Sequence, residues 1–194
     1  MEPISTADSS AQSSSFYITP ISEQENIDDI ISMWQTAFAE PPNTPRYTND
    51  LKLQLQEHMQ LANFLGFLAK QSTDNKILGL IYGYSNEAGQ WWYNSVSKAV
   101  GPVITKSVLN DSFCLTELGV LAAARRHGIA TQLVNMLITH QPHPNVTLST
   151  RSDNVKGLTF YHSTGWTTLV SRMSFGWGFP PYDILIRKVN TGHK

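Results

Sequence analysis

The sequence predicts a single three-layer α/β domain, and three observations lead to this expectation. Its 194 residues, 41% of them apolar, suit one domain with one sizeable core. Strand-like runs alternate with one-sided apolar stripes of helical period along most of the chain. The segment 113–137 passes from a strand pattern through a glycine-containing turn to a helical pattern without a proline. We therefore expect a mixed, mostly antiparallel central sheet of six to seven strands, with helices on both faces.

The N-terminal part predicts a tail, a strand and two helices. Residues 1–15 are mainly Ser, Thr and Ala, which bury too little apolar surface to offset the entropy of ordering, so we expect a flexible tail before a domain at 16–190. Ser22 and Glu25 have the spacing of a capping box, and an apolar stripe then continues to Phe38. A proline-rich segment ends this helix. The elements expected here are a strand at 16–18 and helices at about 27–38 and 50–60.

The rest of the chain supplies the remaining strands and the crossover helix. The two strands that flank the helix after the central turn are expected to pair in parallel, because a helix connects them. The segment 85–111 is too long for a hairpin loop and too apolar for a disordered one, so we treat it as an insert. The expected elements are a hairpin at 63–70 and 76–84, a strand at 113–120, a helix after 130, a strand at 146–150, a helix at 154–163 and strands at 166–174 and 184–188.

Composition narrows the range of functions. With 14 basic and 15 acidic residues the net charge is -1, which gives no broad basic surface for nucleic acid or an anionic membrane. No secretory signal and no apolar run of about 20 residues is present, so we expect a cytoplasmic protein. The single Cys114 excludes an internal disulfide and reads as a buried thiol rather than a nucleophile. His140 and His143 lack accompanying ligands, and we expect no metal site.

The turn after the central strand carries the clearest ligand signal. Arg125 and Arg126 bring two positive charges, and the small residues Gly128 and Ala130 let a phosphate approach the backbone N–H groups closely. The N-terminus of the following helix adds the positive end of its dipole. The pattern therefore predicts a ligand with a diphosphate group.

Together with a second block, this turn resembles motif A of the GNAT superfamily, the acetyl-CoA-dependent N-acetyltransferases, whose signature is Gln/Arg-x-x-Gly-x-Gly/Ala. The second block, residues 154–166, is similar to the family's downstream block, in which an Asn leads a helix, Phe-Tyr follows, and Gly plus an aromatic residue opens the next strand. The resemblance implies a GNAT-type sheet that splays at the cofactor site, with acetyl-CoA as the cofactor. It implies these cofactor-binding residues: Leu118, Gly119, Val120, Arg125, Arg126, His127, Gly128, Ile129, Ala130, Thr131, Asn154 and Tyr161.

Acetyl transfer to an amine needs a base for the amine, donors for the oxyanion and a proton for the departing thiolate. The resemblance implies Glu117 as the base, often through water, although a solvent-facing glutamate on an alternating strand fits the same pattern. It implies Tyr161 as the acid, although a core aromatic fits too. Gly119 marks either the family's strand bulge, with Val120 N–H as the oxyanion donor, or only a weak point in the strand. Asn154 is implied to bind the pantetheine amide, and it also suits a helix N-cap.

The acceptor side is less specific. The candidate substrate-binding residues are aromatic, and they either contact a substrate or form a satellite core: Phe38, Tyr84, Trp91 and Trp92. We expect an N-acetyltransferase that acts on a primary amine of a small molecule by direct attack in a ternary complex. The alternatives are a protein or peptide N-acetyltransferase and a non-catalytic acyl-CoA-binding or sensing domain. Either a monomer or a homodimer is compatible with the sequence.

Overall fold

The computed structural model describes residues 15–40 and 47–189, so the expected tail at 1–15, apart from its last residue, lies outside the described residues. The strands are β1 Phe16–Pro20, β2 Leu65–Gln71, β3 Ile77–Ser85, β4 Ser112–Val120, β5 Asn145–Arg151, β6 Thr167–Met173 and β7 Tyr182–Lys188. The α-helices are α1 Ile27–Ala37, α2 Thr48–His58, α3 Trp91–Ser107, α4 Ile129–His140 and α5 Val155–Ser163. None of these helices in the described ranges has both the length and the apolar character to cross a membrane.

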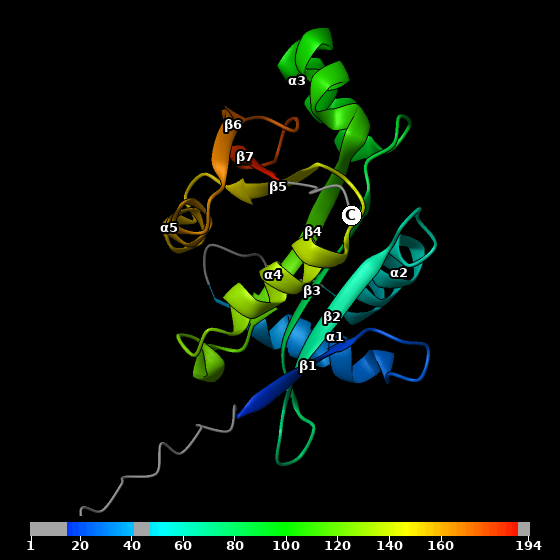
Figure 1. The fold of residues 1–194 in the computed structure, drawn as a ribbon, viewed down its shortest axis with the longest axis vertical. Helices are drawn as coiled ribbons and strands as arrows, with labels where there is room; N and C mark the ends of the chain where they lie inside the picture. Colours follow the sequence, from blue (N-terminus) through cyan, green and yellow to red (C-terminus); the bar gives the residue numbers. More distant parts are fainter. Residues whose placement is uncertain (1–14, 41–46, 190–194) are drawn as a thin grey trace, which may run out of the picture.

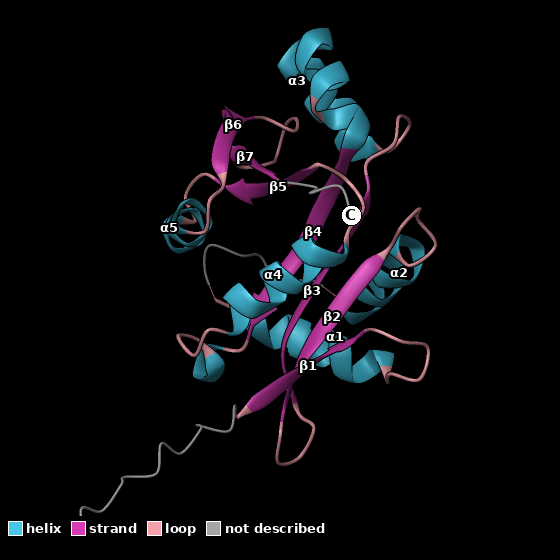
Figure 2. Cartoon of the chain, viewed as in Figure 1, coloured by secondary structure: helices cyan, strands magenta, loops and turns pink. Residues whose placement is uncertain are grey.

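The seven strands form one sheet in the order β1-β2-β3-β4-β5-β7-β6. Every neighbouring pair is antiparallel except β4 and β5, which are joined through α4. The prediction of a mixed, mostly antiparallel sheet with one parallel pair around this helix is therefore confirmed (Figures 1 and 2).

Apolar stripes attach helices to both faces of the sheet (Figure 2). On one face, α1 and α2 bury Ile31, Trp34 and Leu55 against Leu80 and other residues of β2 and β3. On the opposite face, α4 packs its stripe against the main core, whose members include these buried residues: Phe67, Ile81, Phe113, Leu133, Leu137, Val146 and Leu185. Each large side chain removed from water in this way stabilises the fold by roughly 2 kcal/mol.

The insert 85–111 is mainly the helix α3, which bends where Gly101 adopts a φ of 77° directly before Pro102. Its buried residues Tyr93 and Val96 join a third apolar cluster with Met173 of β6 and Ile184 of β7. Figure 1 shows α3 above the end of the sheet that carries β6 and β7. The insert therefore forms the satellite core that the sequence left as one of two options.

The sheet opens in its middle, between β4 and β5. These strands pair over only three residue pairs, Ser112–Cys114 with Asn145–Thr147, although β4 continues to Val120 and β5 to Arg151. Beyond this short contact the two halves of the sheet diverge (Figure 1). The expected splay is present, and it leaves backbone groups on both strands without a ladder partner on the side of the gap.

The bulge expected at Gly119 lies instead at Thr116. On β3, Tyr82 pairs with Glu117 and Gly83 with Leu115, so Thr116 is the extra residue of β4. Gly119 pairs regularly with β3, and its missing Cβ makes room for a ring, because an added Cβ would lie 2.7 Å from Phe38 Cε2. Glycine in this strand thus marks a close approach rather than a bulge.

The start of α1 also differs from the sequence-based expectation. The cap is Asn26, whose side chain accepts from Asp28 N–H at 3.0 Å. Ser22 and Glu25 instead form a turn before the helix, in which Glu25 N–H donates to Ser22 O. Asn26 has the short polar side chain that favours an N-cap. The capping-box spacing of Ser22 and Glu25 nevertheless placed the predicted cap at Ser22, four residues too early.

We expect Asn26→Ala to lower the free energy of unfolding by about 1 kcal/mol, because the N–H of Asp28 loses its capping acceptor. The matched control is Ser22→Ala, which removes the hydroxyl of the sequence-predicted cap and should change stability by less than about 0.5 kcal/mol. Urea unfolding followed by circular dichroism measures both. Equal losses, or a larger loss at Ser22, would contradict this assignment.

Candidate functional site

Two adjoining cavities lie where β4 and β5 diverge. The larger has a volume of about 670 Å³ and the smaller about 270 Å³. Their walls share four residues, namely Phe38, Leu118, Asn154 and Tyr161. The smaller cavity extends from this junction toward the turn before α4, and the larger extends toward Glu117 and the ends of β5 and β7. A long ligand in one cavity can therefore meet a second ligand at the junction.

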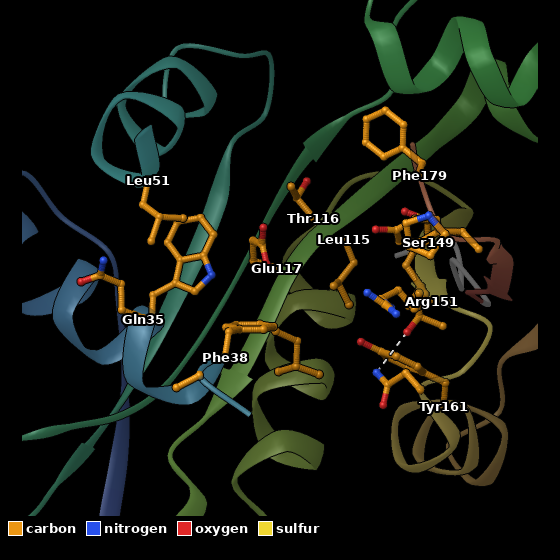
Figure 3. A pocket seen from close by; sticks show the side chains of 18 of the residues that line it. Gln35, Phe38, Leu51, Leu115, Thr116, Glu117, Ser149, Arg151, Tyr161 and Phe179 are labelled. Atoms are coloured by element: carbon orange, nitrogen blue, oxygen red, sulfur yellow. Dashed lines mark hydrogen bonds between the residues drawn. The ribbon is translucent and has the colours of Figure 1, made fainter. Parts of the chain in front are cut away.

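The expected catalytic pair, Glu117 and Tyr161, lines the larger cavity from opposite sides, with Glu117 on β4 and Tyr161 on α5 (Figure 3). Tyr161 is 9% exposed, and burial together with the nearby charge of Glu117 raises the pKa of its hydroxyl above the ordinary value. The phenol therefore keeps its proton at neutral pH and is available as a donor. Glu117 is only partly buried, so the larger cavity and solvent both reach it.

The turn before α4 presents the N–H groups that a diphosphate needs. Gly128 caps α4 with a φ of 80°, a left-handed conformation that favours glycine. The first N–H of the helix with a backbone partner is that of Gln132, which donates to Gly128 O at 3.0 Å. Within the described ranges, the N–H groups of residues 126–131 donate to no other group, and four of these six residues are exposed. This end of α4 fits an anionic ligand.

The side chain of Arg125 is engaged with the protein itself. Its Nε donates to Val120 O (3.1 Å), its Nη2 to Ala37 O (3.1 Å) and its Nη1 to the carboxylate of Glu40 (2.7 Å). Hydrogen bonding to Arg125 and its charge lower the pKa of the Glu40 carboxyl. Arg125 therefore fastens the end of α1 to the end of β4, and direct pyrophosphate binding by its guanidinium stays a prediction. Arg126 is exposed and, among the described residues, forms no hydrogen bond or ion pair.

Leu118 and Val120 direct their N–H groups toward the gap. The N–H of Leu121 bonds to Leu78 O on β3, and N–H directions alternate along a strand, so those of Leu118 and Val120 point away from β3. Val120 lines only the smaller cavity, whereas Leu118 lies at the junction. Both are placed to donate to a group in the gap, and Leu118 is the nearer to Glu117 along the chain.

Asn154 forms the helix N-cap that the sequence gave as one of its two roles. Its Oδ1 accepts from Gly157 N–H (3.1 Å), and its Nδ2 donates to Thr150 Oγ1 at 3.3 Å. An added Cβ on Gly157 would lie 2.4 Å from Asn154 Nδ2, so this glycine allows the cap. Because Asn154 also lines both cavities, contact with the pantetheine amide remains a compatible prediction.

The four aromatic acceptor candidates separate into two groups. Phe38 lines both cavities as predicted, at the C-terminal end of α1. Tyr84, Trp91 and Trp92 line neither cavity. The Trp92 indole N–H instead donates to Ser149 Oγ (3.2 Å), and the ring centroids of Trp91 and Phe179 lie 6.1 Å apart. Both tryptophans therefore contact residues of the cavity wall without lining the cavity. Tyr84 is buried, which raises its pKa to about 12.

Sequence reasoning missed most of the far wall of the larger cavity. Arg151 comes from the end of β5, and Phe179 and Pro180 come from the loop between β6 and β7. Lys156, at the start of α5, lines the smaller cavity. The sequence pointed to the region of both basic residues, because Lys156 lies within the 154–166 block that begins α5 and Arg151 shortly precedes it. The β6–β7 loop carried no comparable pattern, since only the sheet order brings it beside β5.

A Ser–His–Asp array exists outside this site. Ser85 Oγ lies 2.6 Å from His143 Nε2, and His143 Nδ1 lies 2.7 Å from Asp111 Oδ1. Ser85 is 3% exposed and accepts a hydrogen bond from Asn63 Nδ2, and none of these residues lines either cavity. The array joins the end of β3 to the segments that precede β4 and β5, and its serine is buried away from both cavities. In the described part of the chain, no group of three His, Cys, Asp or Glu residues is placed to hold a metal ion.

The single cysteine is buried, as expected, at 4% exposure in β4. Burial raises the pKa of the Cys114 thiol to about 12, so only about one part in ten thousand is thiolate at pH 8. We expect iodoacetamide at pH 8 to label the native protein at least about 100-fold more slowly than the urea-unfolded protein, as measured by intact mass. Comparable labelling rates would show that Cys114 is accessible and would contradict its burial.

Two neighbouring arginines allow a paired test of the turn. We expect Arg125→Gln to lower the free energy of unfolding by about 2 kcal/mol, because two backbone carbonyls and Glu40 lose a donor. Arg126→Gln should leave unfolding unchanged but weaken coenzyme A binding about tenfold, or roughly 1.4 kcal/mol, through the loss of a phosphate-directed charge. Thermal unfolding and calorimetry with coenzyme A measure the two effects. A reversal of the two phenotypes would contradict the roles described above.

Comparisons with known proteins agree with this geometry. The family model described as "Acetyltransferase (GNAT) family" matches residues 27–166. A GCN5-like protein acetyltransferase of Mycobacterium tuberculosis is 30% identical over 115 residues, which cover 55% of this chain and 56% of the relative, so the match spans about half of that protein.

Solved structures show the same fold at low sequence identity. The ribosomal-protein-S18-alanine N-acetyltransferase of Escherichia coli superimposes with a TM-score of 0.61 at 15% identity, covering 90% of this chain and 94% of that one. The yncA protein of Salmonella typhimurium, solved with its cofactor acetyl-CoA, gives a TM-score of 0.64 at 10% identity, covering 93% and 97%. The chain described here belongs to the GNAT family of acetyltransferases.

Proposed function

We propose that this protein transfers an acetyl group from acetyl-CoA to a primary amine of a small molecule, by direct attack while both substrates are bound. The observation that carries the proposal is the junction of the two cavities, where Phe38, Leu118, Asn154 and Tyr161 belong to both walls. The smaller cavity leads toward the anion-binding end of α4, and the larger contains Glu117. The acetyl donor would extend through the smaller cavity, and the amine would approach from the larger.

The residues of this chain would divide the proton transfers. When bound, acetyl-CoA supplies a thioester carbonyl carbon, at which the new C–N bond forms while the C–S bond breaks. Glu117, directly or through water, accepts one proton from the attacking amine. Tyr161, which its raised pKa keeps protonated, donates one proton to the departing sulfur. After product release the proton on Glu117 returns to solvent and Tyr161 regains one, so the enzyme ends unchanged.

Backbone donors in the opened sheet would stabilise the developing negative charge on the carbonyl oxygen. The N–H groups of Leu118 and Val120 face the gap and need no rearrangement to donate. Leu118 lies at the junction and Val120 farther into the smaller cavity, so we favour Leu118 for the oxyanion and keep Val120, the donor expected from the sequence, as its neighbour toward the cofactor.

A protein or peptide amine is the second candidate acceptor. What favours it is the similarity to the M. tuberculosis relative, which is described as a protein acetyltransferase. Against it stands the form of the larger cavity, in which loop residues of 178–180 from one side and α1 from the other surround the volume beside Glu117. A small acceptor fits such a volume without a main-chain binding groove.

We expect Glu117→Gln to lower kcat/KM by at least about 100-fold and Tyr161→Phe by about 10- to 100-fold, because each removes one proton-transfer group. Thiol release from acetyl-CoA with a panel of amines and peptides measures both. Glu57→Gln and Tyr17→Phe, at exposed positions outside the cavities, are the matched controls and should retain wild-type rates.

Turnover that neither variant changes would remove these role assignments. Tight binding of acetyl-CoA without turnover of any amine or peptide would instead support a non-catalytic acyl-CoA sensor.

A further inference from the structure

The larger cavity carries opposite charges on opposite walls. Among the described residues that line it, Glu117 and Arg151 are the charged ones, and the other lining side chains are apolar or neutral. Figure 3 shows Glu117 on the side of β4, with Arg151 across the cavity near Tyr161. A dipolar pocket of this kind complements a ligand that carries both a positive and a negative group.

Asp153 fixes the orientation of the Arg151 guanidinium. Arg151 Nε donates to Asp153 Oδ1 (2.9 Å) and Nη2 donates to Oδ2 (2.6 Å), a bidentate pair along one edge. These bonds use two of the five guanidinium N–H groups, so one N–H of Nη1 and one of Nη2 remain along the Nη1–Nη2 edge, and a second N–H of Nη1 remains beside it. Within the described ranges no side chain or carbonyl accepts from that edge. A planar carboxylate matches its two-pronged geometry.

The position of Arg151 separates it from the cofactor phosphates. Arg151 lines only the larger cavity, whereas Arg125 and Lys156 are the cations of the smaller one, which leads to the turn before α4. A phosphate ligand of the donor would therefore meet the turn, Arg126 and Lys156, and an anionic group at Arg151 would belong to the acceptor. The apolar rings of Phe38 and Phe179 line the same cavity and can contact the body of that acceptor.

We propose that the acceptor is an amino carboxylate, a small molecule whose carboxylate binds the outer edge of Arg151 while its amine lies at Glu117. This inference rests on the proposed acetyl transfer and narrows its substrate class. The ammonium form of such an acceptor is attracted to Glu117 and loses one proton to solvent before attack, so that Glu117 is a carboxylate when it accepts the second proton from the attacking amine. Arg151 then acts as a specificity-determining residue that touches the acceptor but takes no part in proton transfer.

The test compares acceptors that differ only in the anionic group. The thiol-release assay uses three such acceptors, namely phenylalanine, phenylalaninamide and phenethylamine. An amidated tetrapeptide with N-terminal phenylalanine tests the peptide alternative. The enzymes are the wild type, Arg151→Gln, Arg151→Lys and the control Arg172→Gln, which changes an exposed arginine outside both cavities. Calorimetry with coenzyme A and a thermal melt accompany each variant.

We expect the wild type to favour phenylalanine over phenethylamine by about 10- to 100-fold in kcat/KM, the usual value of a hydrogen bond to a charged group. Arg151→Gln should reduce this preference to near one, mainly by raising the KM for phenylalanine, with much smaller effects on phenethylamine turnover and on coenzyme A binding. Arg151→Lys should restore only part of the preference, since an ammonium cannot bind a carboxylate in the same bidentate manner. Arg172→Gln should behave as the wild type.

Equal rates for phenylalanine and its amide in the wild type would overturn the proposal, as would a preference that survives Arg151→Gln. Faster acetylation of the amidated tetrapeptide would favour a peptide acceptor and would also overturn it. If no acceptor turns over, direct calorimetric titration of phenylalanine into the protein loaded with coenzyme A decides the matter, and absence of Arg151-dependent binding refutes the inference. Turnover without a preference for the carboxylate would refute the amino-carboxylate acceptor but not the proposed acetyl transfer. Failure of this inference can therefore be distinguished from failure of the proposed function.

Discussion

The short parallel contact between β4 and β5 is the constraint on which the site depends. Because the strands pair only at Ser112–Cys114 and Asn145–Thr147, the rest of each strand is free to diverge, and the two cavities occupy the space between them. A fully paired sheet would satisfy the N–H groups of β4 and leave no gap. The cost of these open backbone groups is compatible with folding because one continuous core contains residues from both halves of the sheet, among them Phe67 and Leu185, and holds the halves in place.

Contacts from α1 set the shape of the opening. Arg125 bonds to carbonyls at the ends of both α1 and β4, and the Phe38 ring lies where a side chain on Gly119 would otherwise be. The helix end, the strand end and the turn before α4 are thereby held together as one unit. A motif arginine that sequence patterns associate with phosphate thus positions the backbone around the proposed cofactor site.

The larger cavity owes its character to segments from both halves of the sheet. Glu117 lies on one half of the sheet, and Arg151 with the 178–180 loop lies on the other, so the charge separation across the cavity follows from the splay itself. Trp91 and Trp92 on α3 contact Phe179 and Ser149 and so support that far wall without entering the cavity. The insert influences the site through packing.

Local patterns in the sequence determined most of the elements and indicated the family, because helical period, strand alternation and the Arg-x-x-Gly-x-Ala spacing all depend on neighbours within a few residues. The helix α3 was not predicted, and phosphate binding at the turn before α4 stays a prediction. Glu117 and Tyr161, which the family resemblance implied, and Phe38, a candidate for acceptor binding, all line the larger cavity. Only the tertiary structure showed that the bulge lies at Thr116 and that Arg125 bonds to the end of α1. It also showed that Tyr84, Trp91 and Trp92 do not line the cavity and that Arg151 lies opposite Glu117. These features arise from contacts between residues far apart in the chain, which sheet order and strand register decide.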